Sequence, residues 1–356
     1  MIAERIEQIR RALPENSAAL ITNEADCFYF SGFNRSEGMV LITGGSATLF
    51  VDFRYIEAAK AACSEISVKL TYSFFADVAA ALKDENIKTV YVQSEYVTLS
   101  KKGKMQDAFG KTEVSGALDL DKIIGDMRAV KSNFEISLIK SAQEITDRAF
   151  TYIKDKITAG KTEREIALDL EFFMRKEGSE GVAFDTICVS GKNSSKPHGV
   201  PSDKIIEKGD FVTLDFGAAV GGYRSDMTRT VCVGNPTDKM IAVYNTVLKA
   251  QSEALKAIKP GVVCKDVDKV ARGIINEAGF EGTFGHGLGH SVGIDIHENP
   301  SFNTRCEEIT KPGMVITVEP GIYLENEFGV RIEDMIIVTE NACEDITKSE
   351  KELIIL

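Results

Sequence analysis

The sequence predicts an α/β (α+β) protein with two domains, residues 1–125 and residues 126–356. Its 356 residues exceed the length at which a single hydrophobic core usually stops growing. The first domain alternates short helical and strand-like patterns, whereas a long amphipathic pattern begins soon after Asp126. All residues that suggest catalysis lie in the second domain, so we expect a small first domain and a larger catalytic one.

The first domain is predicted from patterns that alternate between helix and strand. Apolar residues recur at helical spacing from Ile2 to Leu13, and AALIT at 18–22 has the composition of a strand. The segments MVLIT (39–43) and ATLFV flank a Gly-Gly pair, which predicts a β-hairpin. The remaining pattern predicts a helix over RYIEAAKAAC, a strand in VKLTYS, a helix around VAAALK and a strand in TVYVQS.

The second domain is predicted to begin with two helices. Apolar residues between Phe134 and Ala142 have helical spacing, and Thr162 with Glu165 fits a capping box at the start of a helix over 162–176. Further helices are expected at 237–258 and 265–278. Strands are expected in FVTLDFG, RTVCVG, MVITVEP and VRIEDMIIV.

Charge and composition exclude several classes of protein. A formal net charge of −12 argues against nucleic acid as a partner, because an acidic surface repels the phosphate backbone. The N-terminal segment lacks the apolar run of a signal peptide, and no segment has the roughly 18 consecutive apolar residues of a membrane span. Seven widely spaced cysteines without a CxxC pair indicate reduced thiols, so we expect a cytoplasmic protein.

The histidines are concentrated in one region of the sequence. The chain has only four, His198, His286, His290 and His297, and the last three lie within the stretch HGLGHSVGIDIH. Histidine is suited to proton transfer at neutral pH and to metal ligation. This clustering predicts one place where chemistry happens.

Four acidic residues lie in strand-like segments of the same domain. Asp215 ends the apolar run FVTLD and Asp226 precedes TRTVCV, so we expect these two aspartates to face each other across a hairpin. Glu319 ends VITVE, and Glu333 is expected within the strand VRIED. Carboxylates among β-branched residues are costly to bury unless they bind a metal or pair with a cation.

Four carboxylates with one imidazole, that of His290, form an oxygen-rich ligand set. Carboxylates that bridge two ions suit a pair of divalent metals, which can activate a shared water and stabilise an oxyanion. Hard oxygen ligands favour Mn²⁺ or Co²⁺, and Zn²⁺ is also compatible with the set.

Four segments of the second domain together carry a family resemblance. They are HGLGHSVGIDIHE (286–298), the DFG…D pair at 215 and 226, VEPGIY (318–323) and GVRIED (329–334). They resemble the pita-bread metallopeptidases, and they are most similar to the branch of Xaa-Pro aminopeptidase (aminopeptidase P) and Xaa-Pro dipeptidase (prolidase). The resemblance implies a creatinase-type N-terminal domain and a pita-bread catalytic domain. It also implies cleavage of Xaa-Pro bonds by a hydroxide that bridges two divalent metals, most readily Mn²⁺.

The same resemblance implies a role for each site residue. The metal ligands would be Asp215, Asp226, His290, Glu319 and Glu333, of which Asp226 and Glu333 would bridge both ions. Glu319 would also act as general base, while His198 and His297 would support the tetrahedral intermediate. His286, Tyr323 and Arg331 would lie on the substrate-binding side, where Arg331 would also brace the carboxylates.

Four other functions share parts of this pattern. GHSVG at 289–293 matches a serine-hydrolase motif, but that fold needs a histidine well downstream, and only His297 follows Ser291. Methionine aminopeptidase shares the ligands, yet the N-terminal domain and the arginine of VRIED resemble the proline-directed branch. A non-catalytic binding protein or a creatinase on this fold is a further alternative, against which the complete ligand set argues.

Between the two proline-directed activities, we expect the Xaa-Pro aminopeptidase. A dipeptidase needs a cation near the site to hold the C-terminal carboxylate of its substrate. Arg305 is a candidate, although a loop arginine is more often solvated. The expected substrates are thus short peptides with proline at the second position. The resemblance further implies a homodimer in which the N-terminal domain limits access to the site.

Overall fold

The computed structural model describes residues 1–34 and 37–356, and contacts within the chain divide it into two units, Met1–Met127 and Arg128–Leu356. Both units combine helices with strands, as the sequence predicts. The expected domain boundary at residues 125 and 126 falls inside helix α6, Leu120–Ala129. In the described part of the chain, no helix is long and apolar enough to cross a bilayer.

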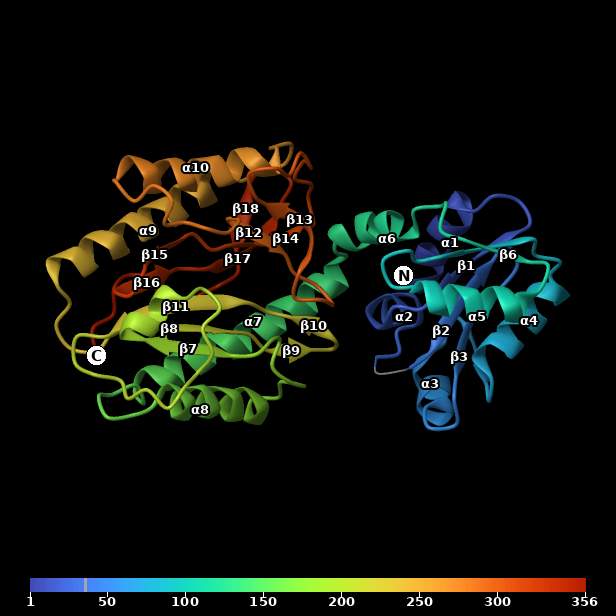
Figure 1. Cartoon of the computed structure of the whole chain (residues 1–356), viewed down its shortest axis with the longest axis horizontal. Helices are drawn as coiled ribbons and strands as arrows, with labels where there is room; N and C mark the ends of the chain where they lie inside the picture. Colours follow the sequence, from blue (N-terminus) through green and yellow to red (C-terminus); the bar gives the residue numbers. More distant parts are fainter. Residues whose placement is uncertain (35–36) are drawn as a thin grey trace. The chain divides into compact units, whose positions relative to one another are not determined.

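The first unit is built on a six-stranded sheet with the order β4-β3-β2-β1-β5-β6 (Figure 1). The predicted hairpin is confirmed as the antiparallel pair β2 and β3, and the other predicted helices and strands of this unit are also confirmed. Helices α2 and α5 and strand β6 lacked a clear apolar period and were not predicted. The elements are α1 (Ile2–Ala12), β1 (Ser17–Ile21), α2 (Glu24–Ser31), β2 (Met39–Thr43), β3 (Ala47–Val51), α3 (Ile56–Ala62), β4 (Ser67–Leu70), α4 (Phe74–Asp84), β5 (Thr89–Val92), α5 (Leu99–Phe109) and β6 (Glu113–Ser115).

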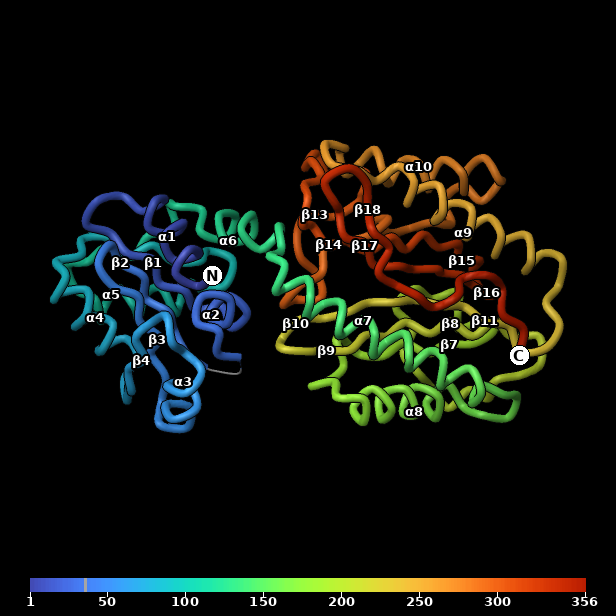
Figure 2. The backbone as a smooth tube through the Cα atoms, turned by 180° about the vertical axis from the view of Figure 1, so that it is seen from behind, coloured from blue at the N-terminus to red at the C-terminus, as the bar shows by residue number. Residues whose placement is uncertain are grey.

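The second unit consists of two halves, each with a pair of helices followed by antiparallel strands (Figures 1 and 2). In the first half, α7 (Asn133–Lys154) and α8 (Glu163–Lys176) pack against a sheet of order β11-β8-β7 and share one apolar core with it. In the second half, α9 (Asp238–Ala257) and α10 (Cys264–Glu277) share another core with a sheet of order β13-β12-β14-β17-β18. All four predicted helices are confirmed, and α8 begins with the predicted capping box of Thr162 and Glu165.

The strands of the second unit are mostly short. They are β7 (Ile187–Ser190), β8 (Phe211–Phe216), β9 (Ala219–Val220), β10 (Tyr223–Arg224), β11 (Met227–Cys232), β12 (Gly289–Ser291), β13 (Glu298–Phe302), β14 (Val315–Val318), β15 (Gly321–Leu324), β16 (Phe328–Arg331), β17 (Asp334–Val338) and β18 (Cys343–Asp345), with a 3₁₀ helix η1 (Gly191–Ser195) after β7.

The two halves are joined where β11 lies beside residues 331–333. The backbone N–H of Glu333 donates to the carbonyl of Thr228 at 3.1 Å, and the hydroxyl of Thr230 donates to the carbonyl of Arg331 at 3.0 Å. Side chains from both halves can therefore converge on one site at this junction.

Candidate metal centre

A cavity of about 1090 Å³ lies in the second unit, between its two halves. Every site residue that the sequence predicts, except Tyr323, lines this cavity. The lining residues from this set are His198, Asp215, Asp226, His286, His290, His297, Glu319, Arg331 and Glu333. Residues far apart in the sequence are thus gathered at one place.

The acidic residues lie at or beside strand ends, and two details differ from the sequence-based expectation. Across the pair β8–β11, Asp215 lies opposite Thr228, while Asp226 precedes β11. The expected pairing of the two aspartates is therefore wrong, because the hairpin turns at residues 221–222, and this register places Thr228 opposite Asp215. The expected strand around Glu333 is also interrupted, since this residue lies between β16 and β17.

Three side chains in the cavity, two carboxylates and one imidazole, place possible metal-ligand atoms close together. One ligand atom each from Asp226, His290 and Glu333 lies within 4.8 Å of the other two. Nε2 of His290 is 3.6 Å from Oδ2 of Asp226 and 3.4 Å from Oε1 of Glu319. Asp226 precedes β11 of the first half, whereas the other three residues belong to the second half. The cluster therefore exists only when the two halves are packed together.

His290 has the tautomer that a metal ligand requires. Its Nδ1 lies 3.2 Å from the carbonyl oxygen of Ser291, which can only accept, so the proton is on Nδ1. Burial and the neighbouring His297 lower the pKa of His290 to about 4, and the ring is neutral at pH 7. The lone pair of Nε2 therefore faces the carboxylates.

The carboxylates form a buried cluster of like charge. Burial and the neighbouring carboxylates raise the pKa of Asp226 and Glu333 well above the ordinary range, and burial raises that of Glu319 to about 8. Oδ1 of Asp215 and Oε1 of Glu333 are buried without a hydrogen-bond donor in the described part of the chain. Buried acceptors of this kind need a partner. Divalent cations fit both features, because they supply positive charge and coordinate oxygen.

Two threonines hold the carboxylates in place. The hydroxyl of Thr228 accepts from Nε of Arg331 at 3.0 Å and donates to Oε2 of Glu333 at 2.6 Å. The hydroxyl of Thr317 accepts from the backbone N–H of His290 at 3.0 Å and lies 3.2 Å from Oε1 of Glu319, to which it donates. Sequence analysis missed both. Each lies two residues from a carboxylate, and the period of two along a strand puts such residues on one face.

Arg331 connects the carboxylates to the substrate side of the cavity. Its Nη2 donates to Oδ2 of Asp215 at 2.6 Å, and its Nη1 donates to the hydroxyl of Tyr323 at 2.8 Å. That hydroxyl lies 2.9 Å from Nε2 of His286. Nδ1 of His286 lies 2.8 Å from the carbonyl of Gly287 and carries the proton, so Tyr323 donates to Nε2. Tyr323 thus supports the cavity wall through Arg331 and His286.

The remaining two histidines lie at the cavity surface. His198 and His297 are both exposed, and the ring of His297 lies edge-to-face with that of His290 at a centroid distance of 4.4 Å. Partial burial and the nearby His198 lower the pKa of His297, which is therefore neutral at pH 7. A neutral imidazole at this position can donate a hydrogen bond to a ligand in the cavity.

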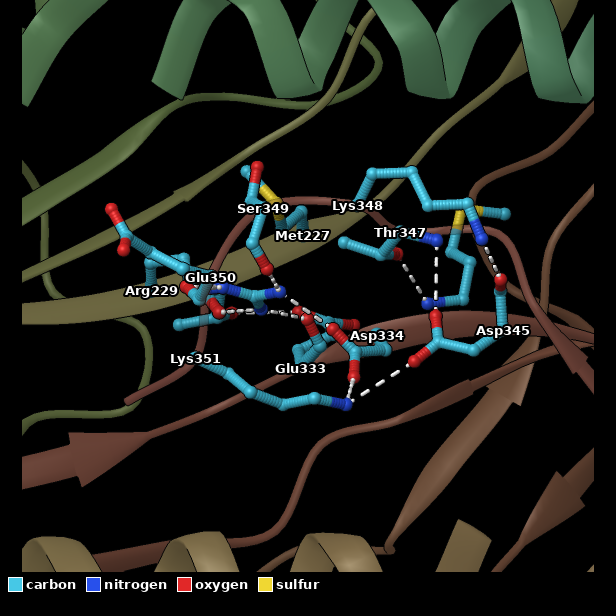
Figure 3. A network of polar contacts seen from close by, with 12 residues as sticks. Met227, Arg229, Glu333, Asp334, Asp345, Thr347, Lys348, Ser349, Glu350 and Lys351 are labelled. Carbon is cyan, nitrogen blue, oxygen red and sulfur yellow. Dashed lines mark hydrogen bonds and ion pairs between the residues drawn. The ribbon is translucent and has the colours of Figure 1, made fainter. Parts of the chain in front are cut away.

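A polar network behind the carboxylates fixes the backbone of Glu333 (Figure 3). It is centred on Arg229, whose side chain is almost fully buried. Its guanidinium donates to the carbonyls of Thr228 (2.9 Å), Glu333 (2.5 Å), Ser349 (2.8 Å) and Glu350 (2.9 Å) and to Oδ1 of Asp334 (2.7 Å). Lys351 and Gln251 donate to the other oxygen of Asp334. The C-terminal segment is thereby attached to the residue next to Glu333.

The chain matches the models of two known protein families. Residues 137–340 match the model of metallopeptidase family M24, and residues 5–130 match that of the creatinase/prolidase N-terminal domain. The chain is a member of metallopeptidase family M24. This confirms the family resemblance and the fold class that the sequence indicates, with a creatinase-type N-terminal domain before the catalytic one.

Named relatives of this M24 metallopeptidase match it over nearly the whole chain. A protein of Pyrococcus horikoshii named Xaa-Pro dipeptidase is 42% identical over 354 residues, which cover 99% of each chain. The solved structure of an Xaa-Pro dipeptidase from Bacillus anthracis is 41% identical, covers 100% of both chains and has a TM-score of 0.96. That of an X-Pro aminopeptidase from Thermotoga maritima is 41% identical, covers 99% of this chain and 100% of its own, and has a TM-score of 0.92.

Proposed function

We propose that this M24 metallopeptidase is an Xaa-Pro dipeptidase (prolidase), which hydrolyses dipeptides with proline at the second position. The sequence alone led us to expect the Xaa-Pro aminopeptidase instead. The names of the Pyrococcus horikoshii and Bacillus anthracis relatives favour the dipeptidase, although the Thermotoga maritima relative has the other name. One feature of the cavity also supports the dipeptidase.

That feature is an arginine of the cavity wall that has no partner among the described residues. Four arginines line the cavity, and three of them are paired with a carboxylate: Arg164 with Asp203, Arg272 with Asp268, and Arg331 with Asp215. The guanidinium of Arg305 is exposed and has no hydrogen bond or ion pair with any described residue. A free guanidinium matches the geometry and charge of a carboxylate. We propose that Arg305 binds the C-terminal carboxylate of the dipeptide.

We propose that two divalent metal ions, most readily Mn²⁺, are held by Asp215, Asp226, His290, Glu319 and Glu333. The unsatisfied oxygens of Asp215 and Glu333 and the free lone pair of His290 support this assignment. Such ions, for which Co²⁺ or Zn²⁺ could substitute, would polarise the scissile carbonyl and activate a water molecule. The ions would also offset the burial and the mutual repulsion that raise the pKa of Asp226 and Glu333.

The other residues are assigned by their position around this cluster. Glu319, which accepts from Thr317 through one oxygen, is proposed as the general base that takes a proton from water and gives it to the leaving proline nitrogen. The rings of His198 and His297 are proposed to donate to the developing oxyanion. His286 and Tyr323 are proposed to support the substrate side through the hydrogen bond between them.

A test of the proposed role of Arg305 distinguishes the Xaa-Pro dipeptidase from the Xaa-Pro aminopeptidase. We expect the native enzyme to cleave Met-Pro faster than Met-Pro amide, because only the dipeptide carries the C-terminal charge. Arg305→Gln should lower kcat/KM for Met-Pro by about ten- to a hundredfold, the usual effect of a hydrogen bond to a charged group. It should leave the amide almost unchanged.

Arg164→Gln is the matched control, since it changes an arginine of the same cavity that is already paired with Asp203. Its preference for the dipeptide should equal that of the native enzyme. Equal cleavage of Met-Pro, Met-Pro amide and Met-Pro-Gly by the native enzyme would reject the dipeptidase and leave the aminopeptidase.

The metal dependence and assembly of the enzyme can be tested in the same samples. Turnover should disappear after chelation and return with Mn²⁺, and activity that survives complete metal removal would reject the proposed mechanism. A homodimer and a cytoplasmic location remain predictions that rest on the family resemblance and composition. Light scattering coupled to size-exclusion chromatography measures the first of these.

A further inference from the structure

A fully buried carboxylate, that of Glu163, lies at the start of helix α8 outside the metal centre. Among the described residues, it accepts hydrogen bonds from three, none of which is a cation. Oε1 accepts from the backbone N–H (2.6 Å) and hydroxyl (3.0 Å) of Ser190 and from Nδ2 of Asn193 (3.2 Å), while Oε2 accepts from the backbone N–H (3.1 Å) and hydroxyl (2.6 Å) of Ser202. These donors compensate the cost of burying the charge.

The donors belong to the two ends of one segment, residues 190–202, which we call the His198 loop. Ser190 ends strand β7, and Ser202 is the last residue of the loop. Oε1 of Glu163 therefore holds the beginning of the loop, and Oε2 holds its end and also accepts a longer hydrogen bond of 3.4 Å from Nδ2 of Asn193. The backbone N–H of Arg164 adds a hydrogen bond of 3.1 Å to the carbonyl of Ser202. One carboxylate thus closes the loop at its base.

His198 lies between these two ends and lines the cavity. Its side chain is exposed and forms no hydrogen bond with any described residue. Its position is therefore set by the backbone of the loop. Near the tip, the carbonyl of Pro197 accepts a hydrogen bond of 3.3 Å from Arg331, but the base is held by Glu163.

We propose that Glu163 is a positioning residue that holds the His198 loop so that the imidazole of His198 faces the metal centre. This inference rests on the proposed function, because that function gives His198 its role toward the substrate. Glu163 itself contacts neither substrate nor metal and acts only through the loop.

The chemistry of the contact requires an ionised carboxylate and not merely a polar side chain. All its partners are N–H or O–H groups that donate, so both oxygens must accept. In Glu163→Gln, one oxygen is replaced by an NH₂ group that faces other donors. At least one end of the loop then loses its hydrogen bonds, and the loop becomes looser.

Hydrogen exchange of the full-length protein measures the loop directly, without substrate. In Glu163→Gln, we expect the backbone amides of residues 190–202 to exchange about tenfold faster than in the native protein. Glu165→Gln is the matched control, because Glu165 lies in the same helical turn but is exposed, and its carboxylate accepts hydrogen bonds from Thr162 and Lys161 instead of the loop. Its His198 loop should exchange at the native rate. Unchanged exchange in a folded Glu163→Gln variant would overturn the proposal.

A double-mutant cycle tests whether the effect on turnover passes through His198. Glu163→Gln should lower kcat for Met-Pro on the order of ten- to a hundredfold with unchanged metal content. In the His198→Ala background, the same change should lower kcat by no more than about twofold. Equal factors in the two backgrounds would show a general structural role and would overturn the proposal.

The proposal can still be tested if the Glu163→Gln variant does not fold or if the proposed function fails. If Glu163→Gln does not fold, Ser202→Ala removes one donor from the end of the loop and should give smaller changes of the same kind. If the native protein cleaves no Xaa-Pro dipeptide, the proposed function fails, while the exchange of residues 190–202 still decides whether Glu163 holds the loop.

Discussion

Nη2 of Arg331 donates a hydrogen bond of 2.6 Å to Oδ2 of Asp215, while Oδ1 of the same carboxylate is buried and has no donor among the described residues. The guanidinium therefore fixes one oxygen of Asp215 and leaves the other for a cation. Because Arg331 also contacts Thr228, which donates to Glu333, a single side chain orients carboxylates from both halves of the catalytic unit.

Arg331→Met should weaken metal binding. Loss of a group that orients metal ligands typically costs ten- to a hundredfold in affinity, and we expect a loss of about that size for Mn²⁺. Isothermal titration calorimetry of the metal-free protein measures it. Tyr323→Phe is the control, since it removes the hydroxyl that Arg331 contacts but leaves the hydrogen bond to Asp215. A native Mn²⁺ affinity in Arg331→Met would contradict the assigned role.

His290 and His297 lie in contact but should respond differently to substitution. His290→Ala removes a proposed ligand, so both metal content and turnover should fall. His297→Ala should lose turnover by about a hundredfold, the size expected for one oxyanion donor, and should keep its metal. Metal analysis of the two purified variants distinguishes the roles. Equal metal loss in both would show that they are misassigned.

The loop that carries His297 is held by a buried ion-pair cluster. The carboxylate of Glu298 pairs with Arg128 and with Lys131, whose Nζ lies 3.1 Å away, and it accepts from the backbone N–H of Ile294 at 2.9 Å. Despite burial, which opposes ionisation, the two cations lower the pKa of Glu298 to about 2. The folded protein therefore binds this proton more weakly than the unfolded chain, whose glutamates titrate near pH 4.3.

Glu298 should consequently make stability depend on pH under acidic conditions. Its contribution of about 3 kcal/mol is complete above the unfolded pKa and is lost as the pH falls through that value toward 2. Urea unfolding between pH 6 and pH 3 should show a steeper loss of stability in the native protein than in Glu298→Gln. Asp295→Asn, which removes the more exposed partner of Arg128, should keep the native slope. Identical slopes for Glu298→Gln and the native protein would contradict the prediction.

Arg229 should be important for stability as well as for the metal centre. Arg229→Met removes the ion-pair partner of Oδ1 of Asp334 and one hydrogen-bond donor from each of four carbonyl groups (Figure 3). Breaking a buried ion pair in this way costs about 3–5 kcal/mol, which chemical unfolding can measure. Lys239→Met, which breaks an exposed pair with Glu327, should cost less than about 1 kcal/mol. A similar cost for both variants would show that the network adds no stability.

The sequence predicted the helices and the set of residues at the site because both leave local patterns. Long amphipathic periods identified α7 to α10, and the unusual placement of acids such as Asp215 beside apolar runs identified the cluster. Residues whose role depends on contacts between distant segments of the chain leave no such pattern. Glu163 looks like any acidic residue in a first helical turn, and only the return of Ser202 to that turn gives it a distinct role.

Register and charge pairing were also inaccessible from the sequence. The position of Thr228 opposite Asp215 depends on the small hairpin β9–β10, whose residues have no strong strand pattern. Arg305 was recognised as a candidate cation, but its distinction from Arg164 and Arg272 depends on which carboxylates lie nearby in space. The preference between aminopeptidase and dipeptidase depends on such pairings, so the sequence led to the less supported alternative.

The division of the proposed ligands between two halves has a consequence for synthesis of the protein. A nascent chain on the ribosome carries Asp215 and Asp226 long before His290, Glu319 and Glu333 are made. Chains that end before Glu333 therefore lack part of the proposed ligand set, and the proposed centre can form only after the second half of the unit has been made.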